Sequence, residues 1–331
     1  MNNGTFSPAA GVVAANFTHN VSAAIEKIWL TYTAPLNGWL AFTIIIWIGG
    51  SLFNLAILLT VLFNRQRSSS KVLIAHQLLL DLLQCALSMP ADIFSTLYLR
   101  PFSSPGCAVM RVPFVWIECT AHWTALATTV NRFVAILFPQ FYKRVSGPAG
   151  IFWFSAVPWL IGFLLSLPYQ TGYGGYFMSN PPWYRCVLIS SDKFSINNIL
   201  YFGFVTPMAL LALLYLALSL RMTVFAPNRG NRVSYSVPVD GMKQRLQKRY
   251  AVAKMLFLSS MLYVVFYLPN PVISWAAPQL LNGTPMPRMW LRTVYCLGFF
   301  INPVVFYCMN AGYRRDLQNM LGKLTSHFTS C

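Results

Sequence analysis

Charged residues are scarce in this chain: only 9% of its 331 residues are Asp, Glu, Lys or Arg, against about 25% in an ordinary soluble domain. Hydrophobic residues make up 56% of the chain. So little charge excludes a soluble globular enzyme and a disordered chain. Lipid is the solvent that accepts so much apolar surface, so the composition predicts an integral membrane protein.

Signatures of catalytic chemistry are also missing. The sequence contains no H-E-x-x-H zinc motif and no G-x-S-x-G nucleophile motif, and its 4 histidines are far apart. Asp81 and Asp92 fall on one predicted helix and do not form a two-helix aspartyl pair. The 7 cysteines are too few for a disulfide scaffold and show no C-x-x-C metal spacing. We therefore expect neither enzymatic activity nor a cofactor.

Seven apolar stretches are long enough to cross a bilayer, which takes about 20 helical residues. Lipid requires each span to satisfy its own backbone groups, and no barrel-like alternation occurs, so all seven are predicted helices. The absence of an internal repeat gives no support to a transporter with two-fold repeats. The predicted fold class is an all-α integral membrane protein, a seven-transmembrane helix bundle with spans at 39–63, 72–97, 108–138, 150–167, 196–220, 250–275 and 289–309.

Basic residues are distributed unevenly over the gaps between the spans. With the N-terminus outside, 17 of the 24 Lys and Arg residues lie on the inner side. We therefore predict an extracellular tail over 1–38, a membrane domain over 39–312 and, over 313–331, an amphipathic helix with a short cytoplasmic tail. Glycosylation sequons fall independently on the same outer side, at Asn3, Asn16, Asn20 and Asn282.

The net charge of +17 also raises the question of nucleic acid. The basic residues lie mostly between apolar runs, so the inner loop 225–248 is interpreted as a solvated cytoplasmic face, and no nucleic-acid partner is expected. After the last span, apolar residues recur at helical spacing with basic residues between them. This pattern predicts a short amphipathic helix on the inner leaflet, with membrane lipid as its partner.

Individual residues of the spans form an ordered set along the chain. Cys107 opens span three, and Arg132 follows it by 25 residues within Asn131-Arg132-Phe133. The set, each member in its proper span, resembles the rhodopsin-like class of G-protein-coupled receptors from about residue 39 to residue 328. The stretch 131–139 is similar to that of nematode serpentine chemoreceptors. The other members of the set are Asn54, Asp81, Trp159, Pro207, Tyr215, Pro269, Asn302 and Pro303.

The resemblance implies a plasma-membrane receptor that binds an extracellular ligand and activates a heterotrimeric G protein. It implies that Arg132 meets the G protein when the bundle opens, and that Asn131, Tyr215, Asn302 and Pro303 belong to the same activation machinery. The prolines of spans five, six and seven imply hinge points. Cys107 and Cys186 both fall on the oxidising outer side, and we pair them in a disulfide.

A polar core of Asn54, Asp81 and Asn302 is a further implication. In relatives this centre often binds sodium. Here Ala121 and Phe299 stand in place of its usual hydroxyl neighbours, so a sodium-bound and an ion-free Asp81 are both open.

The chain also departs from the pattern of this class. Asn131 replaces the acid that normally precedes the arginine, and Arg249 stands at the foot of span six where an acid sometimes pairs with that arginine. Tyr267 takes the place of a frequent tryptophan. Without a neighbouring carboxylate to restrain Arg132, we predict signalling in the absence of ligand.

Ionisable residues within the outer halves of the spans predict the ligand site. Phe114 stands where biogenic-amine receptors carry an aspartate, which disfavours an amine ligand held there. Arg292 either pairs with Glu118 or Asp92 and organises the bundle, or takes a carboxylate, phosphate or sulfate of the ligand. The candidate ligand-binding residues are Arg111, Phe114, Glu118, Tyr267, Asn270, Arg288 and Arg292.

The ligand classes considered are a small organic acid, a lipid-like molecule and a peptide. The aromatic loop 169–194 is expected either to fold as a hairpin lid tied by Cys186 or to lie on the outer membrane surface. The alternative function is a polytopic membrane transporter or channel, which substrate flux in vesicles would distinguish from a receptor.

Overall fold

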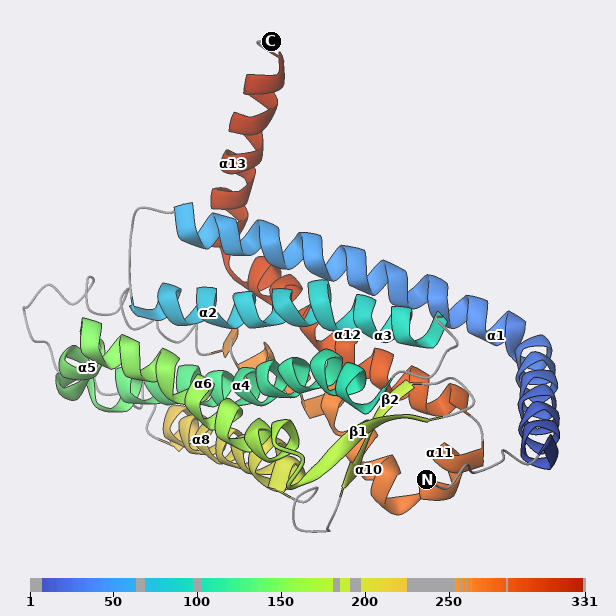
Figure 1. Ribbon diagram of the computed structural model, residues 1–331. Helices are drawn as coiled ribbons and strands as arrows, with labels where there is room; N and C mark the ends of the chain where they lie inside the picture. The colour runs from blue at the N-terminus through green and yellow to red at the C-terminus, as the bar shows by residue number, and fades with distance from the viewer. Residues whose placement is uncertain are drawn as a thin grey trace, which may run out of the picture.

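The computed structural model describes residues 8–63, 69–97, 103–180, 185–190, 198–224, 254–255, 257–259, 261–262, 264–283 and 285–329. Within these residues the fold is a bundle of long helices with one small β-hairpin, as Figure 1 shows. Five helical stretches are long and apolar enough to cross a membrane: Ala34–Phe63, Lys71–Phe94, Pro148–Gln170, Ile199–Leu218 and Met286–Met309.

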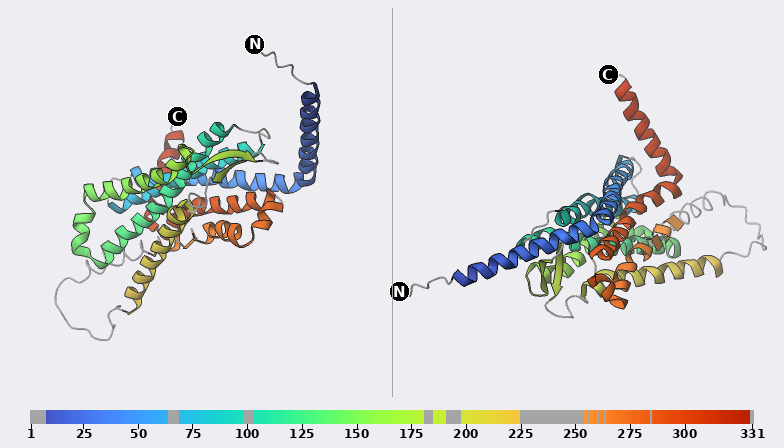
Figure 2. Two further views of the ribbon diagram at one scale, coloured as in Figure 1. Left: turned by 60° about the horizontal axis from the view of Figure 1, so that its bottom comes forward. Right: turned by 90° about the vertical axis from the view of Figure 1, so that its right-hand side faces the viewer.

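The first two predicted spans differ in their regularity. α1 (Pro8–Phe63) is one continuous helix that contains span one, and its first part projects beyond the bundle in Figures 1 and 2. Asn16 and Asn20 lie on this projecting part, whereas Asn3 lies outside the described residues. Span two is built from α2 (Ser69–Leu83), the π-helical turn η1 (Gln84–Ser88) and α3 (Met89–Leu97). Pro90 follows the last residue of η1 by two positions, and a proline removes one backbone donor, which is a recognised cause of such a local irregularity.

Spans three and four lie side by side. α4 (Ser104–Leu137) is long enough to cross a bilayer but carries three charged residues, Arg111, Glu118 and Arg132. The short α5 (Pro139–Val145) connects it to α6 (Pro148–Gln170). Gly162 of α6 has to be small, because a Cβ there would lie 2.3 Å from Thr120 Oγ1 and 2.8 Å from the Trp116 carbonyl oxygen. The missing side chain lets these two helices approach closely.

The later spans are also interrupted near prolines. Span five consists of η2 (Ile199–Val205) and α8 (Thr206–Val224), so a second π-helical turn stands just before Pro207. In span six the described residues include the apolar segment Phe257–Tyr267, after which α10 (Pro269–Ala276) and α11 (Pro278–Gly283) follow. Two of the three predicted hinge prolines therefore coincide with a break in regular helix.

Span seven is α12 (Pro285–Met309), and it continues through Pro303. The predicted amphipathic helix is present as α13 (Ala311–Thr329). Tyr313 and Leu317 are buried against the bundle, while Arg314 and Arg315 are exposed. In Figure 1 the far end of α13 points away from the bundle.

Candidate functional site

The β-hairpin covers the outer end of α4. β1 (Gly175–Asn180) and β2 (Arg185–Ser190) are antiparallel, with Ser179 opposite Cys186. The disulfide Cys107–Cys186 joins β2 to the first turn of α4, which confirms the predicted pairing. Phe177 is 3% exposed and packs with both half-cystines, whereas Tyr173 is 85% exposed. The loop therefore folds as a hairpin tied by Cys186, and Trp183 and Tyr184 lie outside the described residues.

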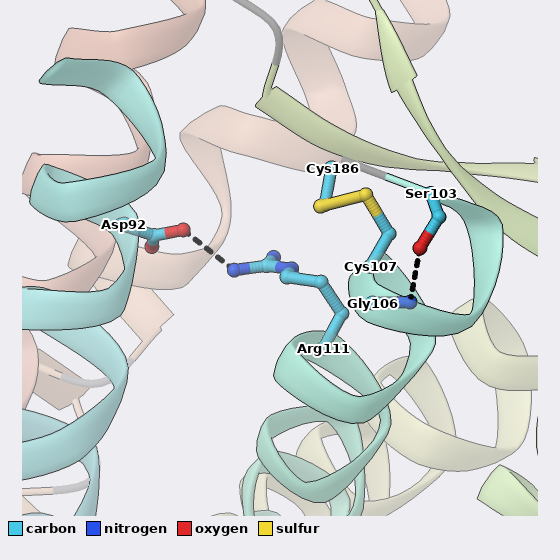
Figure 3. Close-up of a disulfide and its surroundings, with 6 residues drawn as sticks. All are labelled: Asp92, Ser103, Gly106, Cys107, Arg111 and Cys186. Atoms are coloured by element: carbon cyan, nitrogen blue, oxygen red, sulfur yellow. Dashed lines mark hydrogen bonds and ion pairs between the residues drawn. A yellow bond between two sulfur atoms is a disulfide. The ribbon is translucent and has the colours of Figure 1, made fainter. Parts of the chain in front are cut away.

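Directly below the hairpin, four charged side chains form a continuous chain across three helices. Arg111 of α4 donates to Asp92 Oδ1 of α3 at 2.6 Å, as Figure 3 shows beneath the disulfide. Arg292 of α12 donates through Nε to Asp92 Oδ2 at 3.1 Å. Its Nη1 meets Glu118 Oε2 of α4 at 3.4 Å. The order Arg111–Asp92–Arg292–Glu118 alternates in sign, and we call it the ion-pair chain.

Two neutral side chains complete the surroundings of Arg292. Its Nη2 donates to the Ser88 hydroxyl at 3.1 Å, and its guanidinium carbon lies 4.7 Å from the centre of the Tyr295 ring. Ser88 is the last residue of η1 and is fully buried. Of the two interpretations of Arg292, the structure shows the pairing with both Glu118 and Asp92.

Aromatic rings form the floor beneath the ion-pair chain. Tyr267 is fully buried, and its ring lies 4.2 Å from that of Tyr295 and 5.5 Å from that of Phe299. The His122 ring meets it edge-on from α4 at 4.8 Å. Tyr267 therefore stands at the centre of a packed cluster that touches spans three, six and seven.

The other predicted ligand residues lie around this cluster. Phe114 is half-buried and packs against the same core, and its carbonyl accepts from Gln84 Nε2 at 3.3 Å. Asn270 is half-buried in α10, one residue after Pro269. Arg288 is exposed near the start of α12, four residues before Arg292. Its predicted convergence with Arg292 stays a prediction.

The polar core lies deeper, around Asp81. Its carboxylate accepts from Gln77 Nε2 at 3.1 Å and from the amide of Asn302, and the Ser259 hydroxyl donates to that same Asn302 side chain. The Asn54 amide donates to the carbonyl oxygens of Gly50 at 2.9 Å and Phe299 at 3.1 Å, and it thus ties α1 to α12. Its place in the predicted polar core stays a prediction.

Three of the predicted activation residues, Asn131, Arg132 and Tyr215, lie towards the other end of α4, whereas Asn302 belongs to the polar core. Asn131 is fully buried, Arg132 is 6% exposed, and the Tyr215 hydroxyl lies 3.1 Å from Thr129 Oγ1. Burial raises the pKa of Tyr313 in α13 to about 12, with Arg132 lowering and Asp316 raising that pKa as smaller effects. Arg132 therefore lies within electrostatic range of α13. Arg249 lies outside the described residues.

Sequence reasoning did not find Ser88, Gln84 and His122. Ser88 and Gln84 reach their partners from the π-helical turn η1, where the spacing of a regular helix no longer applies. Pro90, two residues after η1, was the sequence feature that could have indicated an irregular turn here. His122 lies four residues after Glu118, on a helix face that spacing directs inward, so its position among the aromatic rings was within reach of the same reasoning.

The structure thus combines a bundle of long apolar helices, a disulfide-tied hairpin with charges beneath it, and a buried arginine towards the other end of α4. The family described as 7 transmembrane receptor (rhodopsin family) matches residues 53–307. The chain belongs to this family. Membership implies a multi-pass protein of the plasma membrane.

Individual relatives are distant and are receptors for peptides by name. Neuromedin-U receptor 1 of Homo sapiens is 22% identical over 267 residues, which are 73% of this chain and 62% of that receptor. Neuropeptide Y receptor type 6 of Mus musculus is 22% identical over 311 residues, 85% of this chain and 79% of that receptor. Neuropeptide receptor 22 of Caenorhabditis elegans is 22% identical over 302 residues, 82% of this chain and 66% of that receptor.

Proposed function

We propose that this receptor binds an extracellular peptide and, in response, activates a heterotrimeric G protein on the inner side of the plasma membrane. The ion-pair chain carries this proposal. Four ionised groups from three helices meet beneath a hairpin, and so many charges suit a ligand with several polar groups. The names of the relatives support the same ligand class.

Of the three ligand classes, the peptide fits these surroundings best. A lipid-like ligand requires mostly apolar walls, and charges beneath the hairpin oppose it. A small acid seated on Arg292 would have to displace Asp92 or Glu118, both of which already contact its guanidinium. The finer resemblance to nematode chemoreceptors stays a prediction.

The second part of the proposal, activation of a G protein, rests on Arg132 and the residues around it. Arg132 lies near the predicted cytoplasmic end of α4, three residues after Thr129, whose hydroxyl lies 3.1 Å from that of Tyr215, and within electrostatic range of α13. A charged residue at such depth is costly unless it has a function or a partner. We infer that Arg132 meets the G protein, with the N-terminus and its glycosylation sites outside.

The test is nucleotide exchange on a purified heterotrimeric G protein by the receptor in lipid nanodiscs. Neuromedin U, neuropeptide Y, galanin and a synthetic peptide library are compared with small organic acids and anionic lipids. We expect at least one peptide to accelerate exchange. Acceleration by acids or lipids alone would overturn the peptide proposal. Substrate flux in vesicles without nucleotide exchange would support the transporter alternative.

Arg132→Ala separates coupling from binding in the same assay. The variant is expected to abolish peptide-stimulated exchange while peptide affinity and surface level stay near those of the parent chain. Lys143→Gln, which removes an exposed charge from the neighbouring α5, is the matched control. Full exchange activity of Arg132→Ala at equal surface level would remove this arginine from the coupling mechanism.

A further inference from the structure

The two middle members of the ion-pair chain, Asp92 and Arg292, use most of their hydrogen-bonding groups within the protein. The two end members, Arg111 and Glu118, do not. Asp92 receives a different arginine on each of its two oxygens. Arg292 directs its Nε and both terminal nitrogens at protein acceptors, and its face lies on Tyr295. The inner pair has thus committed its main contacts within the protein.

The two end members have hydrogen-bonding capacity left. Arg111 uses one terminal nitrogen on Asp92, and its buried Nε meets no acceptor among the described residues. At the other end, the ion pair of Glu118 within the described part of the chain is the 3.4 Å contact with Arg292, and Tyr295 lies close to the same carboxylate. A carboxylate has room for about four donors, so Glu118 can accept more.

The exposed fractions of the four side chains also separate the two end members from the two middle ones. The side chains of Arg111 and Glu118 are 20% and 24% exposed, against 9% for Asp92 and 14% for Arg292. The two ends are therefore the members of the ion-pair chain that an arriving ligand reaches most easily. One end is a cation with free donors and the other is an anion with free acceptor sites.

Helix geometry fixes the spacing of these two ends. Arg111 and Glu118 are seven residues apart on α4, which is nearly two turns, so they share one face of the helix at a separation of about 10 Å along its axis. Arg111 lies four residues from Cys107 and thus on the side of the hairpin, as Figure 3 shows. Glu118 lies deeper in the bundle.

We propose that the site selects a dipolar peptide segment, in which a cationic group enters first and is held by Glu118 while an anionic group, about 10 Å further out, is held by Arg111. The proposal rests on the peptide function proposed above and specifies the chemistry of its ligand. The cationic group is a guanidinium or an ammonium, and the anionic group is a carboxylate. In an extended chain, at about 3.3 Å per residue, the two charges are roughly three residues apart.

Charge balance supports a dipolar ligand over a singly charged one. The two arginines and two acids of the ion-pair chain sum to zero. A ligand with one charge would bring an uncompensated ion beneath the hairpin, which is costly at low dielectric. A ligand with both charges places its anion next to Arg111 and its cation next to Glu118. The alternation of charge then continues at each end, and the ion pair of Asp92 with Arg292 stays intact.

The probe is a library of synthetic eight-residue peptides, each with one Arg at the inserted end and one Glu two to four residues away. Affinity is measured by displacement of a fluorescent member from the receptor in nanodiscs. The tightest binder then enters a double-mutant cycle, with its Arg replaced by the neutral analogue citrulline and the receptor changed by Glu118→Gln. Such a cycle measures a pairwise interaction and cancels general loss of fit.

We expect citrulline to weaken binding to the parent receptor about ten-fold or more, and to change the affinity of Glu118→Gln by less than about two-fold. A second cycle pairs Glu→Gln in the peptide with Arg111→Gln and has the same expected outcome. Asp316→Asn and Lys143→Gln make equal charge changes far from the hairpin and should keep the full citrulline effect. If Glu118→Gln does not reach the surface, Glu118→Asp keeps the charge and should keep discrimination against citrulline.

Three other outcomes separate the two proposals. Equal losses on the parent and variant receptors would overturn the dipolar site and leave the peptide function standing. The same conclusion would follow if the library failed while another peptide stimulated nucleotide exchange. If no peptide of any composition bound or stimulated exchange, the peptide function itself would fail.

Discussion

Two aspartates of span two, Asp81 and Asp92, both join this span to α12. Asp92 does so through ion pairs and Asp81 through hydrogen bonds from neutral amides. Asp92 meets two arginines and is 7% exposed, whereas Asp81 is fully buried and accepts from the neutral amides of Gln77 and Asn302. Eleven residues of one span separate the two sites. Each site is thus a link between the same helices, one made of ion pairs and the other of hydrogen bonds to amides.

The difference shows how one pair of helices carries two tasks. A charged ligand can bind the two end members of the ion-pair chain, because Arg111 and Glu118 have hydrogen-bonding capacity left. The hydrogen bonds that Asp81 accepts from Gln77 and Asn302 are made within the protein, and a buried carboxylate with fitted donors favours one arrangement. We infer that the ion-pair chain receives the ligand at its two ends and that the Asp81 site transmits the resulting shift towards Arg132.

The largest effect is expected when the charged link is broken. Asp92→Asn leaves Arg111 and Arg292 facing each other without their shared counter-charge, and breaking a buried pair in this way costs about 3–5 kcal/mol. The measurement is thermal unfolding of the purified receptor in nanodiscs. The control is Asp316→Asn in α13. An unfolding temperature equal to that of the parent chain would show that the arginines find other partners.

The disulfide keeps the hairpin over the charged link, so its loss is next in size. Cys107→Ser or Cys186→Ser should each cost about 2–5 kcal/mol and reduce surface expression. The double variant should be no worse than either single one, because both residues serve one bond. Cys308→Ser, at an exposed free cysteine, is the control. Additive losses of the two half-cystines would contradict a shared role.

The third prediction concerns the side-chain amide of Asn131, which can be replaced by a carboxylate next to Arg132. Asn131 is fully buried and its amide atoms bond no described residue, so Asn131→Asp places a carboxylate next to Arg132. A restraint of about 1–2 kcal/mol on the resting state should lower ligand-free nucleotide exchange roughly ten-fold. Asn131→Ala adds no charge and should not lower it. A higher ligand-free rate in Asn131→Asp would mean that another contact restrains Arg132.

The smallest change in stability is expected at the amide link. Asp81→Asn keeps an acceptor oxygen and removes a buried charge, so the free energy of unfolding should stay within about 1 kcal/mol of the parent value. The same thermal measurement as for Asp92→Asn compares the two links directly. A loss as large as that of Asp92→Asn would show that the charge of Asp81 is also balanced by cations, and the proposed division of tasks would fail.

Much of this architecture could be predicted because lipid imposes simple rules on a sequence. Apolar length located the spans, and the asymmetry of basic residues gave their predicted orientation. The disulfide was predictable because Cys107 and Cys186 both fell on the predicted outer side. The inward direction of Arg111 and Glu118 followed from the regular spacing of α4.

Other features of the site depended on irregular backbone. The π-helical turn η1 inserts a wider turn between Asp81 and Asp92, so helical spacing does not give the direction of the residues beyond it. Arg292 is enclosed by Asp92, Glu118 and Ser88, and spacing within one helix does not predict contacts between residues of three different spans.

The sequence alone determined the solvent of this protein, its helical class, its family resemblance and the residues able to carry charge into the bundle, because these depend on composition and local spacing. Only the tertiary structure decided which charges meet. Asp92 and Arg292 are 200 residues apart in sequence, and their contact exists because span two packs against α12 through α2 and η1. The partition into a saturated inner pair and two open ends is a property of three helices together, and no single segment of the sequence contains it.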